Sequence, residues 1–139
     1  MAVKTYEFSV QSEGYCHLED ITSQVIVFLE QSGLSDGIAC VAVAGSTAGI
    51  STIEYEPGLL KDIPEFFDKL LPSGKSYHHD ETWHDGNGFS HMRSFLLKTS
   101  HCVPFSGGRL ILGTWQQIVL ADFDNKPRRR KVVVQLVGE

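Results

Sequence analysis

Cysteine is scarce in this chain, and no two cysteines stand in a C-x-x-C arrangement. Cys16, Cys40 and Cys102 are odd in number and far apart. A disulfide framework uses an even set and a thiolate zinc site uses closely spaced thiols, so we expect neither. Isolated cysteines of this kind are typical of small buried side chains and of the reducing cytoplasm, which is where we expect the protein to work.

Long apolar runs and an excess of basic residues are also missing. No run approaches the length that spans a bilayer, and the first ten residues alternate polar and apolar instead of forming a signal peptide, so we expect no membrane partner. Lys and Arg number 12 against 17 Asp and Glu, a net charge of -5. Neutralising phosphates requires an excess of cations, so nucleic acid is not an expected partner.

The remaining composition is that of an ordinary globular protein. A length of 139 residues with 42% hydrophobic residues predicts a single domain covering 1–139. Apolar alternation and short apolar runs predict strands, and a spacing of three to four residues predicts helices. The expected strands are 3–10, 38–44, 50–54, 102–105, 109–112, 114–123 and 128–137, and the expected helices are 21–29, 63–71 and 91–97.

These elements favour an α+β fold with mixed or antiparallel sheets, two or three helices and a C-terminal antiparallel meander. Pro64 lies inside an amphipathic stripe, and the pattern Asp62-x-x-Glu65 resembles a capping box, so the main helix is expected to begin near Ile63. Residues 72–88 are expected to form a long polar loop, which is typical of a functional segment.

The chemistry is concentrated in residues 77–94, which hold four of the six histidines. His79 and Asp80, together with His91, form the sharpest candidate cluster. Imidazole and carboxylate groups bind divalent metals or move protons near neutral pH. The spacing matches no standard zinc signature, so a solvated polar loop with one structural histidine is an equally good interpretation of the residues alone.

The segment Gly45–Gly49 follows a buried strand and carries Ser46 and Thr47. Small residues allow backbone N–H groups to approach an anion, and the two hydroxyls are able to donate as well, so we consider both as substrate-binding residues. No G-K-[ST] sequence is present, which excludes a P-loop. A tight turn between strands is the simpler interpretation.

Three further residues are candidates on chemical grounds. Glu54 ends a strand, where a carboxylate can act as a base or hold Mg²⁺, although a surface acid before a helix explains it equally well. Trp115 is able to stack on a heteroaromatic ring and Gln116 to read its edge, against the simpler interpretation of a core tryptophan. The cluster Arg128–Lys131 suits a phosphate-bearing ligand or a charged strand edge.

Several blocks in one order resemble the YjbQ-like family, whose members are named secondary thiamine-phosphate synthases. They read D-G-I-A-C-V-A-V, S-T-A-G-I-S-T-I-E, H-H-D, D-G-N-G-F-S-H-M-R-S-F-L-L, G-G-R-L-I-L-G-T-W-Q-Q-I and P-R-R-R-K-V-V-V. The resemblance implies a compact α+β fold and a homotrimer. It also implies a site that contains the residues at the family's motif positions, namely His79, His91, Arg93, Glu54, Trp115 and Gln116.

The chain departs from the family pattern at two positions. Many members have histidine where this chain has Gly45, and some have a second histidine where it has Phe89. A divalent metal, Mg²⁺ or Zn²⁺, would then rely on His79, His91 and Asp80. The remaining ligands would come from Glu54, His78, water or a neighbouring subunit.

The resemblance further implies a reaction that joins a hydroxymethylpyrimidine diphosphate to a thiazole phosphate, with pyrophosphate leaving. We therefore expect a small enzyme in which His79, His91, Glu54 and Arg93 are catalytic. Two alternatives stay open. One is a non-enzymatic module that binds a small phosphorylated metabolite through Ser46 and Thr47, and the other is a trimeric assembly protein with structural histidines.

Overall fold

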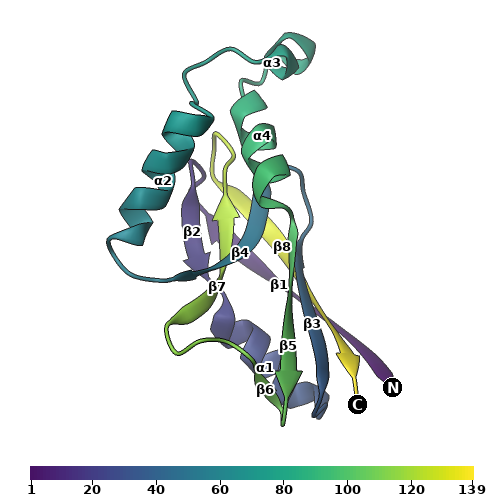
Figure 1. Cartoon of the computed structure of the whole chain (residues 1–139). Helices are drawn as coiled ribbons and strands as arrows, with labels where there is room; N and C mark the ends of the chain where they lie inside the picture. The colour runs from purple at the N-terminus through teal and green to yellow at the C-terminus, as the bar shows by residue number, and fades with distance from the viewer.

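The computed structural model describes residues 1–139 as eight strands and four helices (Figure 1). The strands are β1 (Ala2–Ser12), β2 (His17–Asp20), β3 (Gly37–Val43), β4 (Ala48–Glu54), β5 (Ser100–Ser106), β6 (Arg109–Leu110), β7 (Gln116–Asp122) and β8 (Arg128–Gly138). The helices are α1 (Thr22–Ser32), α2 (Leu59–Leu70), α3 (His78–Trp83) and α4 (Gly88–Leu97). None of these helices has the length and apolar character that crossing a bilayer requires.

The strands form two sheets in which every pairing is antiparallel. The larger sheet has the order β1-β8-β3-β5-β6, and the smaller has the order β2-β7-β4. The predicted α+β class is therefore confirmed. The expected C-terminal meander is wrong in detail, because β7 pairs with β2 and β4 while β8 pairs with β1 and β3. Only β5 and β6 form the predicted hairpin.

The core lies between the two sheets and is closed at one end by α1. Its 17 buried side chains include Val41, Val103 and Val134 from the larger sheet and Ile118 and Leu120 from the smaller one. A second cluster lies on the other side of the smaller sheet, where Phe67 of α2 meets Phe123. The smaller sheet is thus covered on both sides, which explains the almost continuous apolar run in β7.

Helix α2 begins earlier than predicted. Both carboxylate oxygens of Glu56 accept backbone N–H groups at its start, from Gly58 at 2.8 Å and from Leu59 at 2.5 Å. Satisfying these first N–H groups stabilises the helix before Pro64, which then lies inside it. The expected start near Ile63 is therefore wrong.

Helix α3 falls within the segment that was expected to be a loop. Asp80 accepts the backbone N–H of Tyr77 at 3.0 Å and that of Gly88 at 2.9 Å. One carboxylate thereby closes the first turn of α3 and ties it to the start of α4. Together α2, α3 and α4 occupy one end of the molecule, and α1 with β6 occupies the other (Figure 1).

Close packing of α4 on β4 depends on Gly49. A Cβ atom at this position would lie 2.7 Å from the Lys98 carbonyl oxygen and 2.8 Å from Leu97 Cδ2. We expect Gly49→Ala to lower the free energy of unfolding by about 1–3 kcal/mol, because the helix end must move. Gly74→Ala is the matched control, since no atom lies within 4 Å of its added Cβ. Urea unfolding of both variants tests this, and equal stabilities would contradict the packing argument.

Candidate functional site

The two histidines singled out in the sequence lie side by side. His79 stands in the first turn of α3 and His91 on α4, and their ring centroids are 4.3 Å apart with the planes inclined by 50°. The contact arises because α3 and α4 meet through the short turn that Asp80 fixes. Imidazoles at this separation interact electrostatically, so the protonation of one affects the other.

Asn87, which precedes α4, joins this pair to the protein interior. Its side-chain oxygen lies 3.1 Å from His79 Nε2 and its nitrogen 3.3 Å from Asp124 Oδ1. Turned over, the amide donates instead to His79 Nε2 and, at 2.9 Å, to Asp85 Oδ1. The orientation follows the His79 tautomer, because an Nε2 that carries a proton needs an acceptor and a bare Nε2 needs a donor.

Asp124 is a completely buried carboxylate behind the histidine pair. It accepts hydrogen bonds from the Asn125 backbone, from Thr47 Oγ1 at 3.2 Å and from Arg128 Nε at 2.6 Å. Burial acts to raise the pKa of Asp124, but the hydrogen bonds from Asn125, Arg128 and Asn87 outweigh it and hold the pKa below its ordinary value. The group is therefore a fixed negative charge at neutral pH.

Asp122 and Arg130 form a second buried pair next to Asp124. Arg130 donates from Nε to Asp122 Oδ2 at 2.6 Å and from Nη2 to Oδ1 at 2.8 Å, a bidentate arrangement. The same Nη2 donates to Thr47 Oγ1 at 2.6 Å. Thr47 thus links Arg130 to Asp124, and its hydroxyl is used inside the protein instead of facing a ligand. Ser12 completes the set by donating to Asp122.

His91 has an unusual electrostatic environment. Burial lowers its pKa from the ordinary 6.5, and the neighbouring His79 lowers it further. Asp124, Asp85 and the Ser46 backbone act in the opposite direction without cancelling the effect. The ring is consequently neutral at physiological pH and able both to donate and to accept a proton.

A cavity of about 530 Å³ opens beside His91. Its polar lining includes Ser46, Ser94 and Lys98, together with the backbone at Gly45. The Ser94 hydroxyl donates to the Ala48 carbonyl, which leaves Ser46, Lys98 and Thr99 as the other polar side chains that line the cavity. Lys98 lies over the Phe95 ring at 5.0 Å and has no carboxylate within ion-pairing distance. The cavity therefore combines an uncompensated cation with a neutral imidazole.

Two predicted site residues, Asp80 and Arg93, have structural roles. Asp80 is occupied by the backbone of α3 and α4, as described above, and these hydrogen bonds lower its pKa. Arg93 is only 1% exposed and donates to the Leu71 carbonyl at 3.0 Å and to Asp68 at 2.9 Å. Its guanidinium also lies over the Phe89 ring. Arg93 thus fastens α4 to the end of α2 and does not face the histidines.

Three other predicted residues lie at the far end of the smaller sheet. Glu54 pairs with Gln116 across β4 and β7, six residues from the Ala48–Asp122 pair next to the histidines, or about 20 Å along the strand. Trp115 is 73% exposed in the loop before β7 and is not a core residue. Within one chain the structure therefore separates Glu54, Trp115 and Gln116 from His79 and His91.

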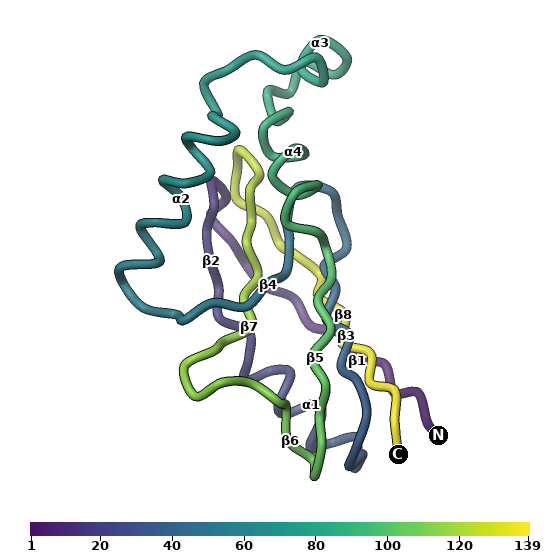
Figure 2. The backbone as a smooth tube through the Cα atoms, in the orientation of Figure 1, coloured from purple at the N-terminus to yellow at the C-terminus, as the bar shows by residue number.

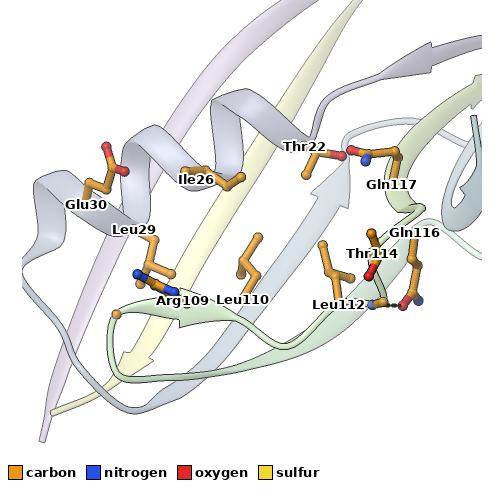
Figure 3. A pocket seen from close by; sticks show the side chains of 12 residues that line it. Thr22, Ile26, Leu29, Glu30, Arg109, Leu110, Leu112, Thr114, Gln116 and Gln117 are labelled. Atoms are coloured by element: carbon orange, nitrogen blue, oxygen red, sulfur yellow. Dashed lines mark hydrogen bonds between the residues drawn. The ribbon is translucent and has the colours of Figure 1, made fainter.

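A second cavity of about 330 Å³ lies at this far end, between α1 and β6 (Figure 3). Leu110 and Leu112 form one wall, and Arg109 and Glu30 flank it. Gln116 borders it, but its amide is engaged by the Gly113 backbone and by Thr52. This cavity contains no histidine and no pair of acid and base groups in contact.

Three of the four residues in the basic cluster Arg128–Lys131, at the start of β8, form ion pairs with carboxylates of the same chain. Arg128 contacts Asp124, Arg130 contacts Asp122, and Lys131 contacts Glu7 at 3.2 Å. A phosphate-bearing ligand would have to compete with these carboxylates. Arg128 and Arg130 therefore neutralise the buried carboxylates behind the histidines and do not face a ligand.

The chain matches known proteins along nearly its whole length. The family model described as UPF0047 protein YjbQ-like covers residues 6–139. A UPF0047 protein of Archaeoglobus fulgidus is 40% identical over 129 residues, which is 93% of this chain and 98% of that protein. This chain belongs to the YjbQ-like UPF0047 family.

Solved structures of similar proteins agree with the fold. A YbjQ-like protein of unknown function from Sulfolobus solfataricus superposes with a TM-score of 0.89 at 32% identity, covering 99% of this chain and 100% of the other. A hypothetical protein from Aeropyrum pernix superposes with a TM-score of 0.91 at 34% identity, covering 98% and 99%. These similarities establish the family and the fold.

The side chains that were expected to bind a metal ion are not gathered into a ligand set in this YjbQ-like chain. No group of three or more His, Cys, Asp or Glu side chains is arranged to hold one. Asp85 Oδ1 lies 3.6 Å from His79 Nε2, but Asp80 is engaged by backbone groups and Glu54 is distant. The predicted divalent metal stays a prediction, and no step proposed below passes through it.

The sequence analysis missed Asn87, Lys98, Asp122 and Asp124. The pattern Asp122-Phe-Asp124 at the end of an apolar strand was the available signal, because two acids directly after a buried strand need partners there. Arg130 was seen only as part of a charge run. Its alternation with Arg129 and Lys131 places it on the buried side of β8.

The contact between the histidines predicts a coupled titration. In His79→Asn we expect the pKa of His91 to rise, because a neighbouring positive charge is removed, and in Asp124→Asn we expect it to fall. Imidazole resonances followed by NMR against pH measure both shifts. His78→Asn is the control, since the His78 side chain is fully exposed. Identical His91 titrations in all the variants would contradict the arrangement.

The buried carboxylates predict a loss of stability in acid. The pKa values of Asp122 and Asp124 lie below the ordinary 3.8 in the folded chain, so the unfolded chain binds more protons as pH falls through 3.8. Their contribution is complete above this pH and is lost as pH falls through the folded pKa values.

The Asp122→Asn variant tests this contribution. We expect it to lower the free energy of unfolding at pH 7 by about 3–5 kcal/mol, because Arg130 remains buried without its counter-ion. We also expect the free energy of unfolding of the variant to fall less steeply as the pH is lowered. Denaturant unfolding between pH 3 and pH 7 measures both, and an acid profile identical to that of the unsubstituted chain would contradict the account.

Proposed function

We propose that this chain is an enzyme that transfers a group from a small diphosphate to a second phosphorylated compound. The reaction is of the thiamine-phosphate synthase type, joining hydroxymethylpyrimidine diphosphate to thiazole phosphate. The observation that supports it is the contact of His91 with His79 at a cavity that also presents Ser46 and Lys98. A volume of about 530 Å³ suits a ligand of this size.

The proposed step breaks one bond and forms another. The thiazole nitrogen forms a bond to the methylene carbon of the pyrimidine, and the bond from that carbon to the diphosphate oxygen breaks. Its electron pair leaves with pyrophosphate. Negative charge therefore develops on the departing oxygens, and the site must stabilise it.

Lys98 and His91 are the groups that meet this requirement. Lys98 has no carboxylate partner, whereas Arg93, Arg128 and Arg130 are already paired. Ser46 lines the same cavity, and its hydroxyl is available to donate to a phosphate oxygen. These groups replace the cations that the sequence analysis assigned to Arg93 and to Arg128–Lys131.

His91 acts through its ring N–H. Burial and the neighbouring His79 lower the pKa of His91, so its ring is neutral near pH 7. The ring N–H of the neutral imidazole donates a hydrogen bond to the departing oxygen and stabilises the charge that develops on it. Asp124 and Asn87 hold the pair in place from the interior.

Assembly is a separate proposal. We propose the homotrimer that the family resemblance implies, and the exposed apolar side chains on neighbouring helices support it. They are Phe66 and Leu70 of α2 and Phe95 and Leu96 of α4. Phe95 also lines the cavity, so an assembly through these helices would enclose the site.

The function predicts a specific effect of His91→Ala. We expect pyrophosphate release from hydroxymethylpyrimidine diphosphate and thiazole phosphate to slow by about 10²–10³-fold, because a hydrogen-bond donor to the departing oxygen is lost, while the circular dichroism spectrum stays unchanged. The measurement is a coupled pyrophosphate assay on the purified protein. His78→Ala, on the exposed side of α3, serves as the matched control.

Three outcomes separate the proposals. Slowed turnover in His91→Ala with normal turnover in His78→Ala supports the enzyme. Substrate binding by calorimetry without turnover in the unsubstituted chain would show a binding module and overturn the enzymatic proposal. A change of mass in light scattering for His91→Ala, with turnover per folded chain retained, would assign the histidine to assembly.

A further inference from the structure

Two of the three cysteines face each other across neighbouring strands. Cys40 of β3 stands directly opposite Cys102 of β5 in the antiparallel register. The two strands run side by side along their whole shared length (Figure 2). Residues 62 positions apart in the sequence (102 − 40) are thereby brought together, which spacing alone did not indicate.

The hydrogen-bond pattern places this pair at the closer of the two kinds of antiparallel position. Val43 N donates to the Thr99 carbonyl, so 43 and 99 form a hydrogen-bonded pair. Alternation along the register makes 41/101 and 39/103 hydrogen-bonded as well, and leaves 40/102 non-bonded. Pro104, which has no N–H to donate, occupies the next non-bonded position, opposite Ile38.

The geometry of a non-bonded pair suits a disulfide. Cα atoms at such positions are about 4.5 Å apart, with the side chains on the same face. Disulfides span Cα separations of about 4.4–6.8 Å, so no strand has to move to form one. Because Cys102 is exposed, a thiol reductant reaches such a bond and reduces it again.

The two thiols also differ in how easily an oxidant reaches them. Cys102 is exposed, whereas Cys40 is half-buried beside it. Burial raises the pKa of Cys40, and the hydrogen bond to Cys102 raises it further. Cys102 is accordingly the thiol that an oxidant reaches first, and Cys40 is the partner positioned to react with the product.

We propose that Cys40 and Cys102 form a reversible disulfide when the protein meets a hydroperoxide. The Cys102 thiolate attacks the peroxide oxygen, which breaks the O–O bond and gives a sulfenic acid and an alcohol or water. The Cys40 sulfur then displaces hydroxide from the sulfenic acid, which leaves as water. Two thiols and one hydroperoxide thus give one disulfide, one alcohol or water and one further water.

The cross-link would join the two strands that lead to the candidate cavity. β3 ends two residues before Gly45, and β5 begins two residues after Lys98. A covalent bond between them restrains both walls of the cavity. The disulfide itself does not depend on the proposed function, so its test stands apart from the turnover assay.

The experiment treats the native, purified chain with hydrogen peroxide and measures the intact mass with and without dithiothreitol. We expect a loss of about 2 Da that reduction reverses, and a peptide map that joins Cys40 to Cys102. Thiol titration after denaturation should fall from the three free cysteines to one, Cys16. Burial raises the pKa of Cys16 to about 12, which keeps it unreactive in the folded chain.

Cysteine variants complete the test. Cys16→Ala should form the same cross-link, and Cys102→Ser should lose it while keeping the circular dichroism spectrum of the unsubstituted chain. Should Cys102→Ser misfold, Cys40→Ser provides the same comparison. Absence of the 2 Da loss, a bond between two chains, or a disulfide that includes Cys16 would each overturn the proposal.

Discussion

The bidentate ion pair between Asp122 and Arg130 is the constraint on which the site depends. Both side chains are buried where β7 ends and β8 begins, and each would be costly to bury alone. Removing one partner leaves an uncompensated charge, so the pair fixes the relative position of the two sheets at this end. Its value to the protein lies in this geometry more than in stability, because buried pairs often contribute little net free energy.

From this pair the arrangement extends outward through a series of hydrogen bonds. Arg130 reaches Thr47, Thr47 reaches Asp124, and Asn87 connects Asp124 to His79. Polar groups inside a low-dielectric interior must be satisfied, and here each satisfies the next. The result is a fixed negative charge behind two imidazoles, of which His91 lines a cavity that also contains an unpaired lysine. Strongly positioned titratable groups of this kind are typical of sites that move protons.

The sequence predicted the parts of this structure that depend on local patterning. Alternation located β1 and an apolar run located β3, and the density of histidines pointed to the segment in which His79 and His91 meet. It did not predict α3, because the stabilising group is one carboxylate, Asp80, that accepts two backbone N–H groups eleven residues apart. The burial of Arg93 was not predicted from the sequence either, since its partners belong to α2 and the residue that follows it. Long-range pairing of this type leaves no periodic signal in the chain.

The most direct test of the account is the imidazole NMR titration of a Thr47→Val variant. Valine keeps the shape of the side chain but removes the hydroxyl that links Arg130 to Asp124. If the buried arrangement positions the histidines, the resonances and the pKa of His91 will change although Thr47 touches no ligand. If Thr47 serves only to bind substrate, the His91 titration of the free protein will be unchanged and substrate affinity alone will fall, which would contradict the account.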